Sequence, residues 1–272
     1  LILYSFFFDQ NSPIKTFSSE KELIVFFLTS ILIYIIGLID DKISIPALNK
    51  LLLISFVISA NLFLNQNLIH EIKLSFLDTI HLNRLSFIFT LFSYIIFMNA
   101  FNMLDGINLQ VGCYSCFVTL FLILNGLNLV IGLTILIALL SYLKLNYNNK
   151  IFFGDNGTLL LAYMFSYFLI KLYTIGNIKF SDEILLILLL PGLEITRLIF
   201  TRLFSNKNIF RADRNHIHHL VKFNNNNYFC FFFIQFLFVA PYFLSMLLKN
   251  NLITILFYSA VYFLTIQFFK KK

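Results

Sequence analysis

The sequence predicts an all-α protein, a polytopic bundle of transmembrane helices, and three observations support this prediction. Apolar residues make up 59% of the 272 positions and charged residues only 12%, whereas an ordinary soluble domain has about 25% charged residues. Glycine (9) and proline (4) are too scarce for a turn-rich β-barrel. The apolar runs are long and unbroken, which is typical of helices. A soluble enzyme, a disordered chain and a disulfide scaffold are excluded, because a soluble chain could not hide so much apolar surface.

Nine segments approach the length of about 20 apolar residues that a spanning helix needs. They are 22–39, 46–64, 85–101, 111–126, 128–145, 157–173, 183–203, 228–248 and 252–269. Pro191 and Gly192 lie inside the seventh segment and predict a kink there. Residues 1–8 are apolar but too short to span, so we expect a stub, the end of a helix whose start is missing. We therefore expect a single integral-membrane domain, 1–272, in an N-terminally truncated fragment.

Because successive spans alternate in direction, the loops between them fall into two groups. One group, together with the inner end of the seventh span, carries 13 of the 20 basic residues and the whole net charge of +7. This group comprises 40–50, 99–110, 144–156, 203–227 and the C-terminal tail. The positive-inside rule places these loops in the cytoplasm.

Five of the eight aspartates lie in the same loops, at or near the ends of spans. They are Asp40, Asp41, Asp105, Asp155 and Asp213. Carboxylates at a membrane boundary are costly, so they indicate a function. Since these loops face one compartment, a helix bundle could bring the carboxylates together over one cleft.

Asp40 and Asp41 are adjacent in the segment GLIDDK. Adjacent carboxylates repel each other unless a cation or a proton is shared between them. A divalent metal, or a metal bound to phosphate, is the natural partner. The alternative is a solvated helix end, although negative charge at that position opposes the helix dipole.

The segment NAFNMLDGIN spaces Asn99, Asn102 and Asp105 three residues apart. On a helix this spacing lines one face with two amides and a carboxylate. Such a face could bind hydroxyl groups, phosphate or hydrated Mg²⁺. The alternative is polar capping of a helix end.

The segment KIFFGDNGT places Asp155 and Asn156 between two glycines, just before a new span. The free N–H groups and the positive dipole at the start of a helix suit phosphate. The carboxylate of Asp155 suits a metal bound to that phosphate, and Phe152 and Phe153 could offer a stacking face to a base. The alternative is a turn that only caps the helix.

The segment RADRNHIHHL concentrates cations and imidazoles in the longest of these loops. It contains Arg211, Arg214, His216, His218 and His219. Arginine pairs well with phosphate, and histidine can bond phosphate, bind a metal or transfer a proton. Zinc is conceivable, but no thiolate accompanies the histidines and the aspartates favour hard cations.

The four segments together predict an anion-plus-metal site, with Mg²⁺ (alternatively Mn²⁺) as the cofactor. This combination fits phosphoryl transfer at a membrane surface. An ion channel or carrier would place charges midway through its spans, and here only Glu194 and Arg197 lie there, three apart and expected to pair. Cys113 and Cys116 form a C-x-x-C pair in an apolar run, which we interpret as packing rather than redox or metal chemistry.

GLIDDK, NAFNMLDGIN, FFGDNGT and DRNHIHHL, in this order and spacing over about residues 30–222, resemble the polyprenyl-phosphate N-acetylhexosamine-1-phosphate transferases (glycosyltransferase family 4). The form of the last motif is most similar to the undecaprenyl-phosphate N-acetylglucosamine-1-phosphate branch. The resemblance implies a Mg²⁺-dependent transferase that moves a sugar-1-phosphate from a UDP-sugar to undecaprenyl phosphate and releases UMP. It also implies a multi-pass protein of the bacterial inner (plasma) membrane with a cytoplasmic active site, initiating cell-envelope polysaccharide synthesis such as that of lipopolysaccharide.

The resemblance also implies roles for individual residues. Asp155 matches the magnesium ligand, with Asn102 as a possible second contact. The residues matched to catalysis are Asp40, Asp41, Asp105, His216, His218 and His219. Those expected to bind substrate are Asn99, Asn102, Asn108, Phe153, Arg211 and Arg214. The expected partners are the UDP-sugar, undecaprenyl phosphate, membrane lipid and a second copy in a homodimer, with no nucleic acid.

The chain departs from the family pattern at one place. The family usually has D-G-x-D-G-L where this chain has Asp105-Gly106-Ile107-Asn108-Leu109-Gln110. The second aspartate is therefore Asn108 and the following glycine is Leu109, so charge and loop shape differ where relatives place the nucleobase. The alternative functions are the phospho-N-acetylmuramoyl-pentapeptide transferase of peptidoglycan synthesis and a non-catalytic membrane transporter or scaffold.

Overall fold

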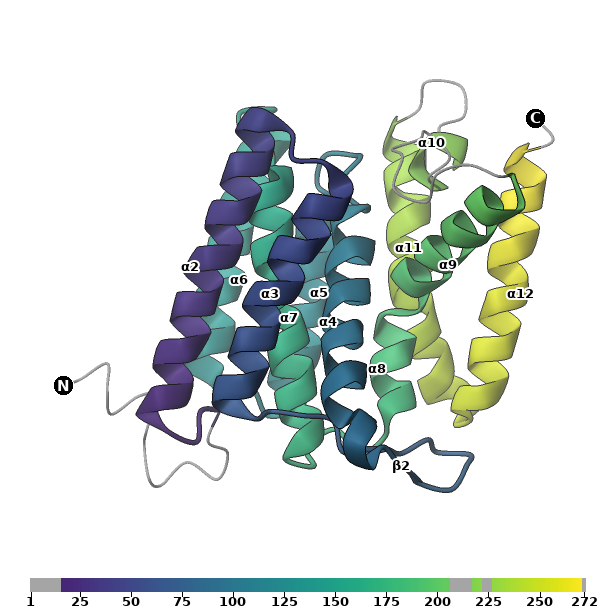
Figure 1. Cartoon of the computed structure of the whole chain (residues 1–272). Helices are drawn as coiled ribbons and strands as arrows, with labels where there is room; N and C mark the ends of the chain where they lie inside the picture. Colours follow the sequence, from purple (N-terminus) through teal and green to yellow (C-terminus); the bar gives the residue numbers. More distant parts are fainter. Residues whose placement is uncertain (1–15, 206–216, 222–226, 271–272) are drawn as a thin grey trace.

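The computed structural model describes residues 16–205, 217–221 and 227–270, and these residues are almost entirely helical (Figure 1). The helices are α2 (Glu20–Ile43), α3 (Ala47–Asn65), α4 (Ser86–Asn102), α5 (Gln110–Leu124), α6 (Leu129–Tyr147), α7 (Gly154–Thr174), α8 (Ser181–Ile187), α9 (Leu189–Phe204), α10 (Ile217–Val221), α11 (Asn227–Leu248) and α12 (Asn251–Lys270). A 3₁₀ turn, Asn83–Leu85, precedes α4, and a small hairpin joins β1 (Glu71–Ile72) to β2 (Ile80–His81). The all-α class is confirmed.

Every predicted span corresponds to helix, but the predicted number of nine spans is not confirmed. Seven of the described helices are long and apolar enough to cross a membrane, or eight if the bent pair α8–α9 is one span. The helix α5 is apolar but has only 15 residues, which is short for a bilayer core of about 30 Å. The structure thus supports a multi-pass membrane protein.

Helix α7 is the centre of the bundle, and α2 and α4 pack along it (Figure 1). Its aromatic side chains are fully buried; Tyr163, Phe165 and Tyr167 are each 0% exposed. Phe26 of α2 stacks on Tyr163, with ring centroids 5.6 Å apart. Aromatic side chains bury large areas and prefer offset or edge contacts, so this packing fixes the neighbouring helices relative to α7.

The predicted kink at Pro191 is confirmed as a break between α8 and α9, which meet at an angle of 76°. Proline has no N–H and its ring clashes with the carbonyl four residues earlier, which here belongs to Ile187. The hydroxyl of Tyr114 in α5 donates to that carbonyl at 3.1 Å. A neighbouring helix therefore satisfies the backbone oxygen that the proline leaves free, as a membrane interior requires.

Candidate functional site

The helix ends that carry the first three predicted motifs meet at one end of the bundle, the upper end in Figure 1. Asp41, near the end of α2, accepts hydrogen bonds from the backbone N–H groups of Asp155 (2.8 Å) and Asn156 (3.2 Å) at the start of α7. The helix dipole favours an anion at this position. Asp41 therefore caps α7 from another helix, and it occupies N–H groups that the sequence predicted for phosphate.

Two glycines permit this close approach. A side chain at Gly37 would place its Cβ 2.4 Å from the Cα of Asn156. Gly154 has a φ of +60°, and a Cβ there would lie 2.7 Å from a carboxylate oxygen of Asp41. The glycines of GLIDDK and FFGDNGT thus allow the two motifs to fit against each other.

Lys50, which the sequence analysis counted only toward topology, joins the same two motifs. Its Nζ donates to Oδ2 of Asp40 at 2.7 Å and to Oδ2 of Asp155 at 2.5 Å. The other oxygen of Asp40 accepts the N–H of Ile45 at 2.6 Å, closing the turn between α2 and α3. Lys50 lies in the first turn of α3, where the helix dipole disfavours a cation, and this was the signal that could have revealed it.

Asp105 lies near Asp41 and Asp155, in the loop between α4 and α5. We call the group of Asp40, Asp41, Lys50, Asp105 and Asp155 the carboxylate corner. Its carboxylate receives a hydrogen bond from the backbone of Gly154. Although the residue as a whole is exposed, burial of its carboxyl group and the charges of Asp155 and Asp41 raise the pKa of Asp105 from 3.8 to about 6. The corner therefore contains more negative charge than Lys50 neutralises.

The asparagines of the second motif separate into two environments. The hydroxyl of Thr158 in α7 donates to the side-chain oxygen of Asn102, so Asn102 lies against the start of α7. The amide of Asn99 instead donates to the carbonyl of Ile95 in its own helix at 2.8 Å. Of the predicted polar face, Asn102 and Asp105 join the corner, whereas Asn99 bonds within α4.

The predicted stacking residue Phe153 already has an aromatic partner. Its ring stacks on Tyr142 of α6, with centroids 3.7 Å apart. The neighbouring Phe152 is 67% exposed. Of the two rings considered for base stacking, Phe152 is the one whose faces remain open.

The departure at Asn108 and Leu109 has a structural counterpart. The amide of Asn108 donates to the side-chain oxygen of Asn149, and the N–H of Leu109 donates to that of Asn146 at 2.6 Å. Leu109 has a φ of +69°, and the left-handed region costs a residue with a Cβ about 1–2 kcal/mol. Glycine adopts this conformation without strain. The hydrogen bonds from the end of α6 therefore hold Leu109 in a backbone conformation that is unfavourable for leucine.

The arginine–histidine motif is only partly described. Arg211, Arg214 and His216 lie outside the described residues. The backbone of His218 and His219 lies in α10, but their side chains also fall outside the description. α10 docks through Ile217 and Val221, which are 1% and 0% exposed. The roles predicted for these arginines and histidines stay predictions.

The corner offers the kinds of atoms that bind a hard divalent cation, but its described residues do not form a complete metal-binding site. Within residues 16–205, 217–221 and 227–270, no three His, Cys, Asp or Glu side chains are grouped so as to hold a metal. Mg²⁺, however, usually binds through one or two carboxylates, with water and substrate phosphate completing its shell. The carboxylates of Asp155 and Asp105 and the side-chain oxygen of Asn102 are donors of this kind, and the charges of Asp155 and Asp41, after burial, raise the pKa of Asp105, which a cation would counter.

An apolar cavity of about 410 Å³ lies between α4, α7, α8 and the start of α9. Its lining runs from Ile72 and Tyr173, near the hairpin end, to Ala100 in the last turn of α4. Pro191 and Gly192 also line it, so the break between α8 and α9 shapes the cavity. Ala100 and Asn102 both lie in the last turn of α4, so the cavity extends to the end of the helix that carries Asn102.

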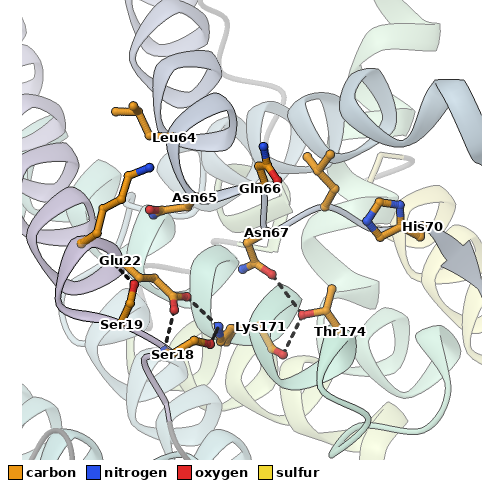
Figure 2. Close-up of a pocket in the computed structure, with 12 residues that line it drawn as sticks. Ser18, Ser19, Glu22, Leu64, Asn65, Gln66, Asn67, His70, Lys171 and Thr174 are labelled. Atoms are coloured by element: carbon orange, nitrogen blue, oxygen red, sulfur yellow. Dashed lines mark hydrogen bonds and ion pairs between the residues drawn. The ribbon is translucent and has the colours of Figure 1, made fainter.

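A polar cavity of about 290 Å³ lies at the opposite end of the bundle, between the start of α2 and the ends of α3 and α7. Figure 2 shows Glu22 and Lys171 pointing toward each other in its wall, with Ser18 beside them. The lining contains no residue that the sequence analysis assigned to the site. This cavity is therefore separate from the carboxylate corner.

The fold and the corner define a class: a multi-pass helical membrane protein with a carboxylate-rich site at one end, beside an apolar cavity. Residues 23–173, more than half of the chain, match the family model of glycosyl transferase family 4. The chain belongs to glycosyl transferase family 4, as its motifs predicted.

The chain is similar to three proteins named undecaprenyl-phosphate alpha-N-acetylglucosaminyl 1-phosphate transferase. The identity is 29% over 145 residues for the protein of Escherichia coli (strain K12), 28% over 148 residues for that of Yersinia pestis and 28% over 145 residues for that of Salmonella typhi. These matches cover 48–50% of the chain and 39–40% of each relative. The family match contains the first three motifs and ends before the arginine–histidine motif.

Proposed function

We propose that the protein transfers N-acetylhexosamine-1-phosphate from a UDP-sugar to undecaprenyl phosphate and releases UMP. The proposal places the reaction at the cytoplasmic face of the bacterial inner membrane, as the first step of cell-envelope polysaccharide synthesis. The observation that carries it is the grouping of Asp40, Asp41, Asp105 and Asp155 at one end of the bundle, where Lys50 pairs with Asp40 and Asp155 and an apolar cavity extends to the end of α4. Membership of glycosyl transferase family 4 and the names of the relatives support it.

The apolar cavity is the proposed site of the lipid acceptor. A polyprenyl chain is all hydrocarbon and suits this apolar lining, where van der Waals packing would hold it, because the membrane it comes from is equally apolar. A chain lying along the cavity past Pro191 and Gly192 toward Ala100 would bring its phosphate to the end of α4, where Asn102 lies. The acceptor then reaches the corner sideways from the membrane rather than through water.

The donor diphosphate is proposed to lie over the start of α7. Asp155, with Asn102 as a second contact, would hold the Mg²⁺. When bound, the metal would neutralise the charge of the diphosphate. Lys50 keeps the carboxylates of Asp40 and Asp155 next to each other. The arginines and histidines of 211–219 are proposed to bind the donor phosphates, since both side chains are good phosphate partners.

In the transfer step an oxygen of the acceptor phosphate attacks the sugar-bearing phosphorus, and the bond from that phosphorus to the UMP oxygen breaks. Phosphate monoesters have a second pKa near 6, so the attacking oxygen is largely ionised at neutral pH. Asp40 and Asp41 are therefore not needed as strong general bases. Their contribution is positioning, which can account for several kcal/mol of a barrier.

The proposal is tested with the full-length protein by following UMP release with undecaprenyl phosphate, Mg²⁺ and a panel of UDP-sugars. We expect release with a UDP-N-acetylhexosamine and loss of more than about 1,000-fold in Asp155→Asn, because charge neutralisation is a large part of phosphoryl transfer. Asp78→Asn, an exposed aspartate at the hairpin end, is the control and should keep full turnover. Normal UMP release by Asp155→Asn would refute the scheme.

The same panel separates the alternatives. Turnover with UDP-N-acetylmuramoyl-pentapeptide and with none of the simpler sugar nucleotides would identify a pentapeptide transferase. Absence of turnover with every donor, despite lipid binding, would identify a transporter or scaffold. Asn108 and Leu109 replace the family's aspartate and glycine, so the donor panel is also the measurement that decides which sugar is used.

A further inference from the structure

A buried ion-pair cluster links three helices of the C-terminal part of the bundle, outside the carboxylate corner. Oε1 of Glu194 accepts from Arg197 in the same helix at 2.7 Å. Oε2 accepts from the hydroxyl of Tyr262 in α12, and the Nε of Arg197 donates to that same hydroxyl at 2.9 Å. Glu194, Arg197 and Tyr262 are 2%, 6% and 0% exposed. The pairing that the sequence predicted for Glu194 and Arg197 is confirmed.

The cluster also contacts the backbone of α10. The N–H of Ile217, the first residue of that helix, donates to Oε1 of Glu194 at 2.8 Å. Ile217 directly precedes His218 and His219 in the chain. A carboxylate on α9 therefore sets the position of the backbone that carries His218 and His219.

A cluster of this kind is not the most stabilising way to fill a buried space. Buried ion pairs lose much of their attraction to desolvation, and apolar residues of the same volume often stabilise a fold better. A carboxylate does something that apolar packing does not: it fixes one N–H by a directional, charge-assisted hydrogen bond. The break before Pro191 directs α9 across the bundle toward α12 and α10 (Figure 1), and Glu194 lies in the first turn after that proline.

We propose that Glu194, held by Arg197 and Tyr262, is a positioning residue that sets α10, and with it His218 and His219, for sugar-phosphate transfer. The inference rests on the proposed function, because it assigns the histidines a part in that reaction. Glu194 acts through α10 and touches no substrate. Loss of its charge loosens the start of α10 and lowers the rate of transfer.

The chain contains a matched control at the other end of the bundle. Glu22 accepts from Lys171 (2.7 Å) and from the hydroxyl of Tyr167 (2.5 Å), and it also holds a backbone N–H, that of Ser18, at 2.6 Å. The two clusters share their chemistry, a buried carboxylate with a cation, a tyrosine and one backbone N–H. In the part of the chain that the structure describes, it is the Glu194 cluster that contacts α10.

The test compares Glu194→Gln and Tyr262→Phe with Glu22→Gln and Tyr167→Phe in the full-length protein. Amide hydrogen exchange, followed by mass spectrometry, measures the protection of 217–221, and UMP release measures kcat and the KM for the UDP-sugar. We expect exchange at 217–221 to rise at least about tenfold in Glu194→Gln and less in Tyr262→Phe. We also expect kcat to fall at least about tenfold in Glu194→Gln, as misplacement of a supporting group does, while both Glu22→Gln and Tyr167→Phe leave kcat unchanged.

Tyr262→Phe is the second variant in case Glu194→Gln fails to fold, because it removes one hydroxyl group and leaves the Glu194–Arg197 ion pair in place. Unchanged exchange at 217–221 in both variants would overturn the proposal. Faster exchange together with an unchanged kcat would also overturn the proposal. Glu194 would then hold α10 in the wild type without affecting the rate of transfer. An inactive wild type would refute the proposed function instead, and the exchange data would show separately whether Glu194 holds α10.

Discussion

At the end of the bundle that carries the β1–β2 hairpin, Glu22 and Lys171 form a buried one-to-one ion pair. At the other end, Lys50 is shared by Asp40 and Asp155, with Asp41 and Asp105 beside them. Both ends place charged side chains where helices meet the membrane boundary. Among the described residues of these two groups, only Glu22 and Lys171 pair one to one.

The difference separates a structural use of charge from a functional one. A balanced pair needs nothing more, so Glu22 and Lys171 can be explained by packing and by their hydrogen bonds. Four carboxylates lie at this end, and Lys50 pairs with two of them; burial first, and then the charges of Asp155 and Asp41, raise the pKa of Asp105. An unbalanced corner of this kind is costly for folding and suits a site that awaits a cation and phosphate.

Glu22→Gln should have the largest effect on stability. It leaves the charge of Lys171 buried and unpaired, and breaking a buried pair in this way costs about 3–5 kcal/mol. We expect a clear fall in the melting temperature in detergent, with turnover per folded molecule unchanged. The double variant Glu22→Gln/Lys171→Met is the control, and it should recover part of the loss. If Glu22→Gln had the same melting temperature as the wild type, the Glu22–Lys171 pair would not be structural. The contrast between a structural and a functional use of charge would then be lost.

In contrast to Glu22→Gln, Lys50→Met should lower activity much more than stability. Without the ammonium group, Asp40 and Asp155 repel each other and separate, and misplacement of reacting groups can cost about 100-fold in rate. UMP release measures this loss. Lys21→Met, a lysine at the start of α2 that lines the polar cavity, is the matched control and should retain full turnover. Equal turnover in the two variants would contradict the role given to Lys50.

Leu109→Gly should stabilise the corner by about 1 kcal/mol, because glycine adopts the left-handed region without the clash of a Cβ. Thermal unfolding measures the gain. Leu109→Ala keeps the Cβ and is the control, so it should not stabilise. A gain in the alanine variant, or a loss in the glycine variant, would show that the backbone of Leu109 is not strained.

The smallest expected effect is a pH dependence at Asp105. The folded state favours the neutral carboxyl group, so the wild type loses stability as the pH rises from about 4 through about 6. Asp105→Asn should therefore raise the melting temperature more at pH 7 than at pH 5. Asp78→Asn serves as the comparison and should give the same small change at both values. A benefit of Asp105→Asn that is equal at pH 5 and pH 7 would argue against the raised pKa.

Local pattern was sufficient for some parts of the site and not for others. The pairing of Glu194 with Arg197 follows from a spacing of three within one helix, and the kink follows from Pro191, so both could be predicted. The place of Lys50 in the first turn of a helix was a signal, but it did not identify the partners, which lie 10 and 105 residues away in the chain. Phe153 was chosen for stacking without knowledge that α6 would place Tyr142 against its ring.

The sequence by itself determined that the protein is a helical membrane protein, because apolar runs of this length have no other stable form in lipid, and its motifs predicted the family. Only the tertiary structure decided that Asp41 caps α7, that Lys50 is shared by two aspartates and that Glu194 holds the start of α10. The physical reason is that composition and periodicity act along the chain, whereas these contacts depend on which helix ends become neighbours. That choice is made by side-chain packing between helices, as in the approach of Gly37 to Asn156.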